Sequence, residues 1–260
     1  MAGTTDELIR ERRGAVSIVR LNRPEARNAL TPGLLAAIGA AIVDAETDAD
    51  VRVLVITGTG DRAFCAGMDL RAFSRGEAMA TGDDEATAAY HRLTRGEVSV
   101  PLVGAANATA VAGGFELLLG CDLIVASSQA QFGLPEVKRG LFPAGGGTAI
   151  GTRVPLSVAL EMTMTGDSIS AARAYELGLV NAVVAPDDVL STALDFADRI
   201  AANAPLGLAA VKDLVRLSIT DASEARTRLA EWQTRVFSSE DAKEGAAAFV
   251  EKRPPVWRGV

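Results

Sequence analysis

The sequence predicts an α/β protein with a helical region at its C-terminal end. Short apolar runs rich in β-branched residues are followed by Gly-rich turns and then by segments of helical period, and this unit recurs without a fixed residue-level repeat. No strand pattern follows residue 186, where only helical periodicity remains. At 260 residues, the chain fits one large domain or a domain with an appendage.

Composition narrows the class of protein. The chain is 48% hydrophobic and 23% charged, as expected of a soluble globular protein. The net charge of −7 argues against nucleic acid as the main partner, but a small anionic ligand needs only a local basic patch. No apolar run reaches the roughly 18 residues of a membrane span, and the N-terminus lacks the charged flank and apolar core of a signal peptide. We therefore expect a cytoplasmic protein without a membrane partner.

The cysteines and the single histidine do not form a reactive pattern. Cys65 and Cys121 lie among apolar or small residues, which is typical of buried cysteines in a reducing compartment. His91 lies in a polar, helical stretch and is expected at the surface. Two cysteines and one histidine provide no metal-ligand cluster, so no metal site and no histidine-based triad are expected.

The first half of the chain contains two clear strands and two helices. β-Branched runs predict strands at 15–21 and 51–56. Thr31 followed by Pro32 is a strong helix start, and an apolar stripe continues this helix to about residue 47. A second helix is expected at about 84–97, after a polar stretch rich in Gly, Asp and Ala.

The central stretch places a carboxylate directly after a glycine pair. A buried strand at 101–107 leads to Gly113 and Gly114, and Glu116 follows at the start of an apolar run. If this run is a helix, its first N–H groups have no helical partner and can stabilise a developing negative charge. A Gly-rich bend with a first-turn Glu that complements the helix dipole is the alternative. Further elements are expected as strands at 122–126 and 131–136 and a flexible turn at 142–147 that opens a helix.

Four helices are expected at the C-terminal end, at 186–202, 205–219, 223–237 and 239–251. Ser238 with Asp241 fits a capping box for the last helix. The Lys and Arg side chains of these helices are expected on solvated faces. We divide the chain into a core at 1–195, which holds the site, and a helical trimerisation region at 196–260.

Several motifs in fixed order resemble the enoyl-CoA hydratase/isomerase (crotonase) family, and the resemblance runs from about residue 8 to 255. The motifs are Asn22-Arg23-Pro24 with Asn28-Ala29-Leu30, Phe64-Cys65-Ala66-Gly67-Met68-Asp69-Leu70, Gly113-Gly114-Phe115-Glu116-Leu117, Phe132-Gly133-Leu134-Pro135-Glu136, Ala144-Gly145-Gly146-Gly147, and Thr165-Gly166-Asp167 with Leu177-Gly178-Leu179-Val180-Asn181. The resemblance implies a crotonase-like (ClpP/crotonase) spiral of ββα units, capped by C-terminal helices. It also implies a homotrimer or a dimer of trimers that binds acyl-CoA and needs no cofactor.

The resemblance also implies which residues are catalytic. By motif match, the backbone N–H groups of Ala66 and Gly113 form an oxyanion hole for the thioester enolate. Glu116 and Glu136 match the two glutamates of the family's hydratases. We expect Glu116 to orient and deprotonate water and Glu136 to deliver a proton to Cα. Without the motif, Glu136 would be interpreted as an ordinary turn residue after Pro135.

The contacts with coenzyme A are likewise implied by motif match. The matching positions are Arg27, Ala63, Ala66, Gly67, Met68, Asp69, Leu70, Gly113, Gly114 and Lys252. Lys252 lies where a C-terminal cation meets the CoA phosphate, across a subunit boundary in some arrangements, and a solvated surface lysine is an equal alternative.

The sequence therefore predicts an enoyl-CoA hydratase, a lyase that reversibly adds water to 2-enoyl-CoA thioesters. An enoyl-CoA isomerase is the nearest alternative, because it needs only one well-placed carboxylate. An acyl-CoA thioester hydrolase and a non-enzymatic acyl-CoA- or RNA-binding relative are further alternatives. The negative net charge and the presence of both glutamates argue against the non-enzymatic alternative. The acyl chain, the pathway and the physiological direction are left open.

Overall fold

The computed structural model of the chain describes residues 7–69 and 84–260. Its main sheet has six strands in the order β1-β2-β3-β4-β6-β9. β1 runs antiparallel to β2, and every other neighbouring pair in this sheet is parallel. The strands are β1 (Leu8–Arg13), β2 (Val16–Leu21), β3 (Val53–Gly58), β4 (Leu102–Ala106), β6 (Leu123–Ser127) and β9 (Ala182–Val184). The predicted α/β class is confirmed.

The sequence pattern did not indicate β1 or β9 of this sheet. The reason is clearest for β1. Leu8 is buried, but the rest of β1 is charged or partly exposed, so the run lacks the apolar character of the other strands. β1 lies at the edge of the sheet and pairs only with β2. Charged side chains are a common feature of edge strands, because they discourage pairing with another chain.

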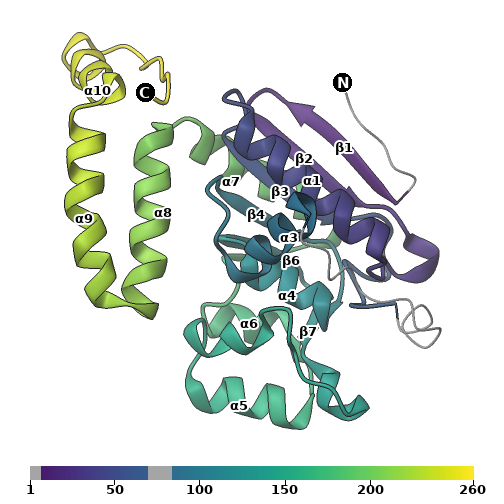
Figure 1. The fold of residues 1–260 in the computed structure, drawn as a ribbon. Coiled ribbons are helices and arrows are strands. Elements are labelled where there is room, and N and C mark those ends of the chain that lie inside the picture. The colour runs from purple at the N-terminus through teal and green to yellow at the C-terminus, as the bar shows by residue number, and fades with distance from the viewer. Residues whose placement is uncertain (1–6, 70–83) are drawn as a thin grey trace.

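The two faces of the sheet carry separate hydrophobic clusters. Along β3, Val53 and Val55 pack into one cluster and Leu54 and Ile56 into the other, as the two-residue period of a strand requires. Helix α7 (Val189–Ala201) covers the first face. The other face is covered by α1 (Pro32–Thr47), α3 (Glu85–Arg95) and α4 (Gly113–Gly120), so the sheet is buried on both sides (Figure 1).

The helices on that second face begin where the sequence places their caps. The side chain of Thr31 accepts a hydrogen bond from the N–H of Leu34, and Pro32 follows at the first helical position, as predicted. Asp84 caps α3 in the same way by accepting from the N–H of Thr87.

A small second sheet continues the winding of the chain. β5 (Ala110–Val111) and β7 (Gln131–Gly133) are parallel, and β8 (Ile169–Ser170) pairs antiparallel with β7. The remaining elements of the core are short helices, namely η1 (Pro24–Ala26), η2 (Pro135–Arg139), η3 (Gly147–Thr152), α5 (Leu156–Thr165), α6 (Ala171–Glu176) and η4 (Pro186–Asp188). The expected turn at 142–147 does open a helix, of the 3₁₀ type.

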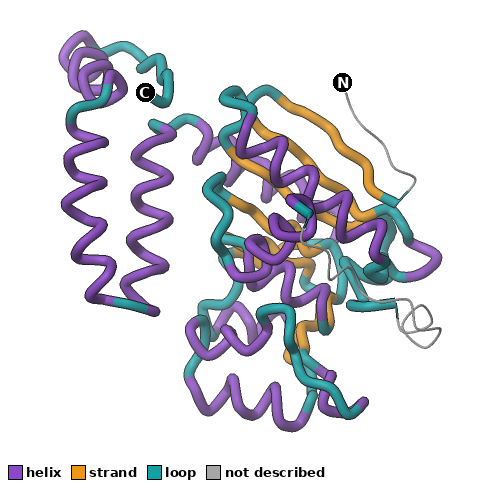
Figure 2. The backbone as a smooth tube through the Cα atoms, in the orientation of Figure 1, coloured by secondary structure: helices purple, strands orange, loops and turns teal. Residues whose placement is uncertain are grey.

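The C-terminal region consists of helices followed by a short terminal loop, and it stands beside the sheet (Figures 1 and 2). It consists of α8 (Pro205–Thr220), α9 (Ala222–Phe237) and α10 (Glu240–Glu251). The expected division at 195/196 falls inside α7, which packs on the sheet, so the region that stands apart begins at α8. The cap of α10 is Ser239 rather than Ser238, because the Ser239 side chain accepts from the N–H of Ala242.

Two basic side chains of α8 are partly buried and paired with the core, in contrast to the solvated faces expected for these helices. The ammonium group of Lys212 lies 2.8 Å from the Asp122 carboxylate and donates to the carbonyl oxygen of Val100 at 2.8 Å. Arg216 also binds Asp122, at 2.8 Å. Asp122 precedes β6, so these pairs attach α8 to the sheet. None of the helices in residues 7–69 and 84–260 combines the length and apolar character needed to cross a membrane.

Candidate active site

Two loops distant in sequence meet at the start of α4. Single β-bridges join Leu30 to Met68 and Cys65 to Ala110, so the loop after β3 lies beside the strand that enters α4. A Cβ on Gly67 would come within 3.2 Å of the backbone nitrogen of Gly113. Gly67 also has a φ of 84°, in the left-handed region that favours glycine. The small residues of both motifs therefore let two backbone segments approach closely.

The backbone turns sharply immediately before α4. Ala112 has φ 51° and ψ −132°, a conformation that costs a non-glycine residue about 1–3 kcal/mol. This turn places Gly113 and Gly114 in the first turn of α4, where their N–H groups have no helical carbonyl to bind. The predicted helix start is confirmed, and its first N–H groups are suited to bind an anionic oxygen.

The second predicted donor, the N–H of Ala66, has a partner already. It donates to the carbonyl oxygen of Arg27 at 3.0 Å, which fixes the two predicted loops against each other but leaves this N–H unsuited to an oxyanion. The N–H of Met68, two residues on, has no acceptor among the residues that the structure describes. Met68 is therefore a better candidate than Ala66 for the second donor.

Glu116 is held by the glycine loop that precedes η3. Its side chain is buried, at 6% exposure, and its Oε1 accepts a 2.9 Å hydrogen bond from the N–H of Gly147. A Cβ on Gly145 would come within 2.5 Å of Oε2, so the loop can close on the carboxyl group only as glycine. Burial raises the pKa of Glu116, and the N–H groups of Gly147 and Gly145 partly offset this effect.

Glu136 lies in the first turn of η2, close enough to Glu116 to be affected by its charge. Burial is the main cause that raises the pKa of Glu136, and the charge of Glu116 adds to it. Its Oε2 is buried and has no hydrogen-bond partner within the described parts of the chain. A buried carboxyl oxygen without a partner costs about 1–3 kcal/mol or more, and such groups are characteristic of functional sites.

A buried tyrosine also lies near Glu116. Tyr90 of α3 is 6% exposed. Burial, followed by the nearby groups of Cys65 and Glu116, raises the pKa of the Tyr90 hydroxyl well above its usual value. The sequence analysis gave no role to Tyr90, because a tyrosine in an amphipathic helix is ordinarily a packing residue. Cys65 and Cys121 are buried and unpaired, as predicted, and burial raises the pKa of each thiol to about 12.

The predicted CoA-binding residues fall into two groups. Arg27, Ala63, Gly67, Met68 and Asp69 lie in the two loops that meet beside Gly113. Arg27 is exposed and adopts a left-handed conformation with φ 53°, whereas Ala63 is buried. The carboxylate of Asp69 lies 3.3 Å from the guanidinium of Arg23, which makes it part of the loop's framework.

Two predicted residues are not gathered with the others. Leu70 lies outside the described residues. Lys252 is exposed at the end of α10. Within the same chain, α10 lies farther from the start of α4 than α8 does (Figure 1). No group of three potential His, Cys, Asp or Glu ligands that could hold a metal ion is found within residues 7–69 and 84–260.

One buried amide was missed by sequence reasoning. Asn28 is fully buried, donates to the carbonyl oxygens of Thr59 and Ala63, and accepts from the N–H of Arg23. Its side chain thereby holds together the two loops that carry Arg27 and Ala66. A polar residue between apolar ones in Asn28-Ala29-Leu30 was the available signal, since a buried amide must find hydrogen-bond partners.

Backbone donors beside two neighbouring carboxyl groups are an arrangement that can stabilise an oxyanion and transfer protons. The sequence model of the enoyl-CoA hydratase/isomerase family matches residues 11–260, and the chain belongs to this family. It is 39% identical to a carnitinyl-CoA dehydratase of Proteus mirabilis over 254 residues, which is 95% of this chain and 96% of that protein. It is 38% identical to enoyl-CoA hydratase EchA19 of Mycobacterium tuberculosis over 253 residues, 94% of each chain.

Solved structures agree with this assignment. The crystal structure of an enoyl-CoA hydratase from Mycobacterium tuberculosis H37Rv superposes with a TM-score of 0.91 at 39% identity, covering 98% of this chain and all of that chain. The likeness extends over nearly the whole length, so the predicted crotonase-type fold is confirmed together with the C-terminal helices.

Proposed function

We propose that the protein is an enoyl-CoA hydratase, which reversibly adds water across the 2,3 double bond of 2-enoyl-CoA thioesters. The observation that supports this proposal is the pair of interacting carboxyl groups, Glu116 and Glu136, together with the free N–H groups at the start of α4, which carries Glu116. Relatives named enoyl-CoA hydratase and carnitinyl-CoA dehydratase support the same class of reaction, written in either direction.

The two glutamates divide the proton transfers between them. Glu116, whose Oε1 is held by Gly147, orients the water and takes its proton as oxygen adds to Cβ. Glu136, whose pKa is raised by burial and by Glu116, delivers a proton to Cα. A raised pKa suits this role, because a general acid is most effective when its pKa lies near the working pH.

Backbone donors stabilise the negative charge that builds on the thioester oxygen. We assign this role to the N–H groups of Gly113 and Met68, in place of the expected Ala66, whose N–H is bound to Arg27. Removing one such donor in other enzymes costs about 3–4 kcal/mol of transition-state stabilisation. No metal or other cofactor is part of this proposal, and coenzyme A enters as part of the substrate.

The alternatives from the sequence remain distinguishable by their products. An isomerase moves the double bond with a single carboxylate and adds no water, and the presence of two neighbouring glutamates favours the hydratase. A thioester hydrolase cleaves the bond to coenzyme A, and a non-enzymatic acyl-CoA- or RNA-binding protein leaves the thioester unchanged.

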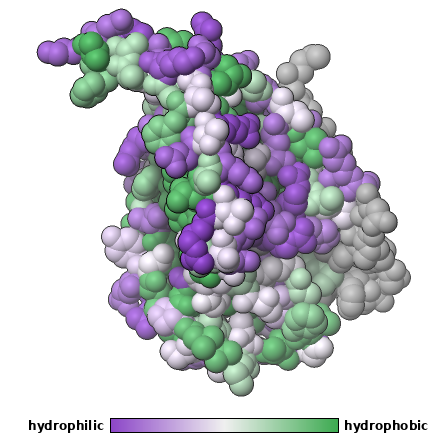
Figure 3. All heavy atoms as spheres, turned by 60° about the vertical axis from the view of Figure 1, so that its left-hand side comes forward, coloured by the Kyte–Doolittle hydropathy of each residue, from purple (hydrophilic) through white to green (hydrophobic). Residues whose placement is uncertain are grey.

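A homotrimer or dimer of trimers forms part of the proposal. α8 exposes Val211, Val215 and Ile219, and α5 exposes Leu156, Leu160 and Met164, each set spaced four residues apart on one helix face. Hydrophobic residues are visible on the side of the molecule that carries the C-terminal helices (Figure 3). Contact between Lys252 and the CoA phosphate would then come from a neighbouring subunit. We place the protein in the cytoplasm, which its two unpaired, buried cysteines support.

The experiment that tests the proposal uses labelled water. The purified protein is incubated in H₂¹⁸O with crotonyl-CoA, longer 2-enoyl-CoA thioesters and a 3-enoyl-CoA, and the products are identified by mass. A hydratase yields a hydroxyacyl-CoA that has gained one labelled water. Free acid and coenzyme A would instead identify a hydrolase, and a shifted double bond without added mass would identify an isomerase.

A further inference from the structure

The C-terminal end of α4 is bound by two arginines from other elements. This short helix begins with Gly113 at the proposed oxyanion hole and carries Glu116 one turn later. The last carbonyl groups of a helix lack helical partners and need donors from elsewhere. Here the donors are guanidinium groups, from Arg153 at the end of η3 and from Arg216 of α8.

Arg153 joins α4 to the segment that binds Glu116. Its Nη1 donates to the carbonyl oxygens of Leu119 at 2.9 Å and Cys121 at 3.2 Å. Arg153 directly follows η3, whose first residue, Gly147, donates its N–H to Glu116. η3 is thus attached to α4 at both ends, through a backbone N–H at one end and a guanidinium at the other.

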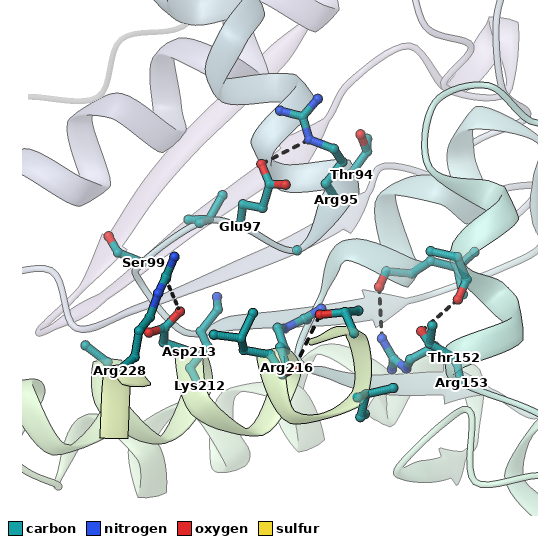
Figure 4. A pocket seen from close by; sticks show the side chains of 18 of the residues that line it. Thr94, Arg95, Glu97, Ser99, Thr152, Arg153, Lys212, Asp213, Arg216 and Arg228 are labelled. Carbon is teal, nitrogen blue, oxygen red and sulfur yellow. Dashed lines mark hydrogen bonds and ion pairs between the residues drawn. The ribbon is translucent and has the colours of Figure 1, made fainter. Parts of the chain in front are cut away.

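Arg216 binds the same helix end from the C-terminal region. Its Nη2 donates to the carbonyl oxygens of Gly120 and Cys121, each at 3.1 Å, and its guanidinium pairs with Asp122. Arg216 and Arg153 line a cavity of about 750 Å³ between α8, α9 and the core. Figure 4 shows Lys212 and Arg216 on α8, with Thr152 and Arg153 in a different part of the cavity wall.

The charge of the largely buried Arg153 distinguishes its contact with α4 from ordinary side-chain packing. Arg153 is largely buried, and burial and the neighbouring Arg216 lower its pKa. None of the ion pairs found in the described parts of the chain involves Arg153. Its guanidinium instead binds the carbonyl oxygens at the end of α4, and the nearby charge of Asp122 also favours its charged form. The negative end of a helix dipole favours a cation there.

We propose that Arg153 is a positioning residue that holds η3, and with it the Gly147 N–H, in register with Glu116 on α4. This inference rests on the proposed hydratase function. Arg153 does not touch the reacting atoms. It fixes the distance between the two elements that jointly hold the carboxyl group, and Arg216 extends the same attachment to the C-terminal helices.

Loss of Arg153 has a defined consequence for Glu116. If η3 moves away, Glu116 loses the Gly147 hydrogen bond that favours its ionised form, while its burial and the nearby Glu136 of η2 and Tyr90 of α3 remain. The base then ionises only at higher pH. The acidic limb of the pH profile of kcat/KM should therefore move upward, and kcat should fall by about tenfold to a hundredfold, the scale of a small misplacement of a catalytic group.

The test compares Arg153→Met and Arg153→Lys with a matched control, Arg52→Met. Arg52 is also half-buried and also donates to two carbonyl oxygens, those of Ala201 and Trp257, but lies at the start of β3 away from Glu116. Crotonyl-CoA hydration is measured against pH, and amide hydrogen exchange of residues 145–152 is measured without substrate. Arg153→Met should lower kcat more than it raises KM, shift the acidic limb upward and accelerate exchange in 145–152.

Arg153→Lys keeps a cation at the helix end and should restore part of both effects, whereas Arg52→Met should change neither the pH profile nor exchange in 145–152. An Arg153→Met protein with parental kcat, pH profile and exchange would overturn the inference. The same holds if all its effects match those of Arg52→Met. If the parent chain does not hydrate crotonyl-CoA, the proposed function fails, while the exchange measurement still decides whether Arg153 holds η3 in place.

Discussion

The N–H of Gly147 and the carboxyl group of Glu116 form a 2.9 Å hydrogen bond across 31 positions of sequence. The bond requires a loop that approaches the carboxyl group without side chains, and Gly145, Gly146 and Gly147 provide it. Gly146 has φ 121°, which only glycine adopts readily, and its neighbours approach the oxygens of Glu116 from one side. The glycine run is therefore part of the catalytic site rather than a flexible turn.

Gly145→Ala should reduce turnover strongly while the fold is retained. The new Cβ would lie 2.5 Å from Oε2 of Glu116, so the carboxyl group or the loop must move. The resulting misplacement of the Glu116 carboxyl group is expected to lower kcat for crotonyl-CoA hydration by about a hundredfold. The measurement is steady-state kinetics, with circular dichroism to verify the fold.

Gly151→Ala is the matched control for this substitution. It lies in the following 3₁₀ helix, and a Cβ there meets no atom within 4 Å. Its kinetics should equal those of the parent protein. Equal turnover by the Gly145 and Gly151 variants would show that Glu116 does not depend on this loop.

Glu116→Gln should make the protein more stable at neutral pH. The folded state raises the pKa of Glu116 above its ordinary value of 4.5, mainly through burial. A raised carboxyl pKa contributes stability below pH 4.5 that is lost as pH rises through the folded value, because folding disfavours the ionised form. Gln carries no charge and avoids this loss.

Thermal unfolding at several pH values checks this expectation. The melting temperature of Glu116→Gln should exceed that of the parent at about pH 7 to 8, and the difference should shrink as pH falls toward 4.5, the ordinary pKa of the carboxyl group. A difference that grew on acidification would mean that the ionised form of Glu116 is the one stabilised by folding.

Local patterns predicted most of the framework. Thr31-Pro32 marked the start of α1, and the fully buried β3 and β4 were evident as apolar runs. Family motifs pointed to Glu116 and Glu136, and in the structure the charge of Glu116 contributes to raising the pKa of Glu136. These features depend on residues near one another in sequence or on motifs, which is why a single sequence reveals them.

Long-range contacts could not be predicted in this way. The motif pointed to Ala66 as an oxyanion donor, but only the folded chain shows that its N–H binds Arg27 while that of Met68 does not. Lys212 and Arg216 had the sequence pattern of a solvated helix face. Both nevertheless bind Asp122, because α8 packs against that edge of the core. Arg216 and Asp122 are separated by 94 positions in the sequence. Such pairings depend on how α8 docks, which no local pattern encodes.

An assembly of threefold symmetry should be disrupted at the exposed apolar stripe of α8. Val215→Asp places a charge in the centre of this stripe, where the parent side chain is 58% exposed in the single chain. Light scattering should give a mass of three or six chains for the parent and a smaller mass for the variant. Gln233→Asp, at an exposed polar position of α9, is the control and should assemble like the parent. A monomeric parent at micromolar concentration would exclude the assembly.

The two glutamates separate the hydratase from the isomerase. Gln has nearly the shape of Glu but cannot act as a carboxylate base, so Glu116→Gln and Glu136→Gln should each lower crotonyl-CoA hydration by about 10²–10⁴-fold. The double variant should be little worse than the poorer single variant, because the effects of removing groups that act on one water are not additive.

An isomerase would give a different pattern. Glu136→Gln alone would abolish conversion of 3-enoyl-CoA to 2-enoyl-CoA, and Glu116→Gln would leave it nearly intact. The proximity of the two carboxyl groups, through which the charge of Glu116 helps to raise the pKa of Glu136, favours the first pattern. Hydration by Glu116→Gln at the parent rate would refute the division of roles between the two residues.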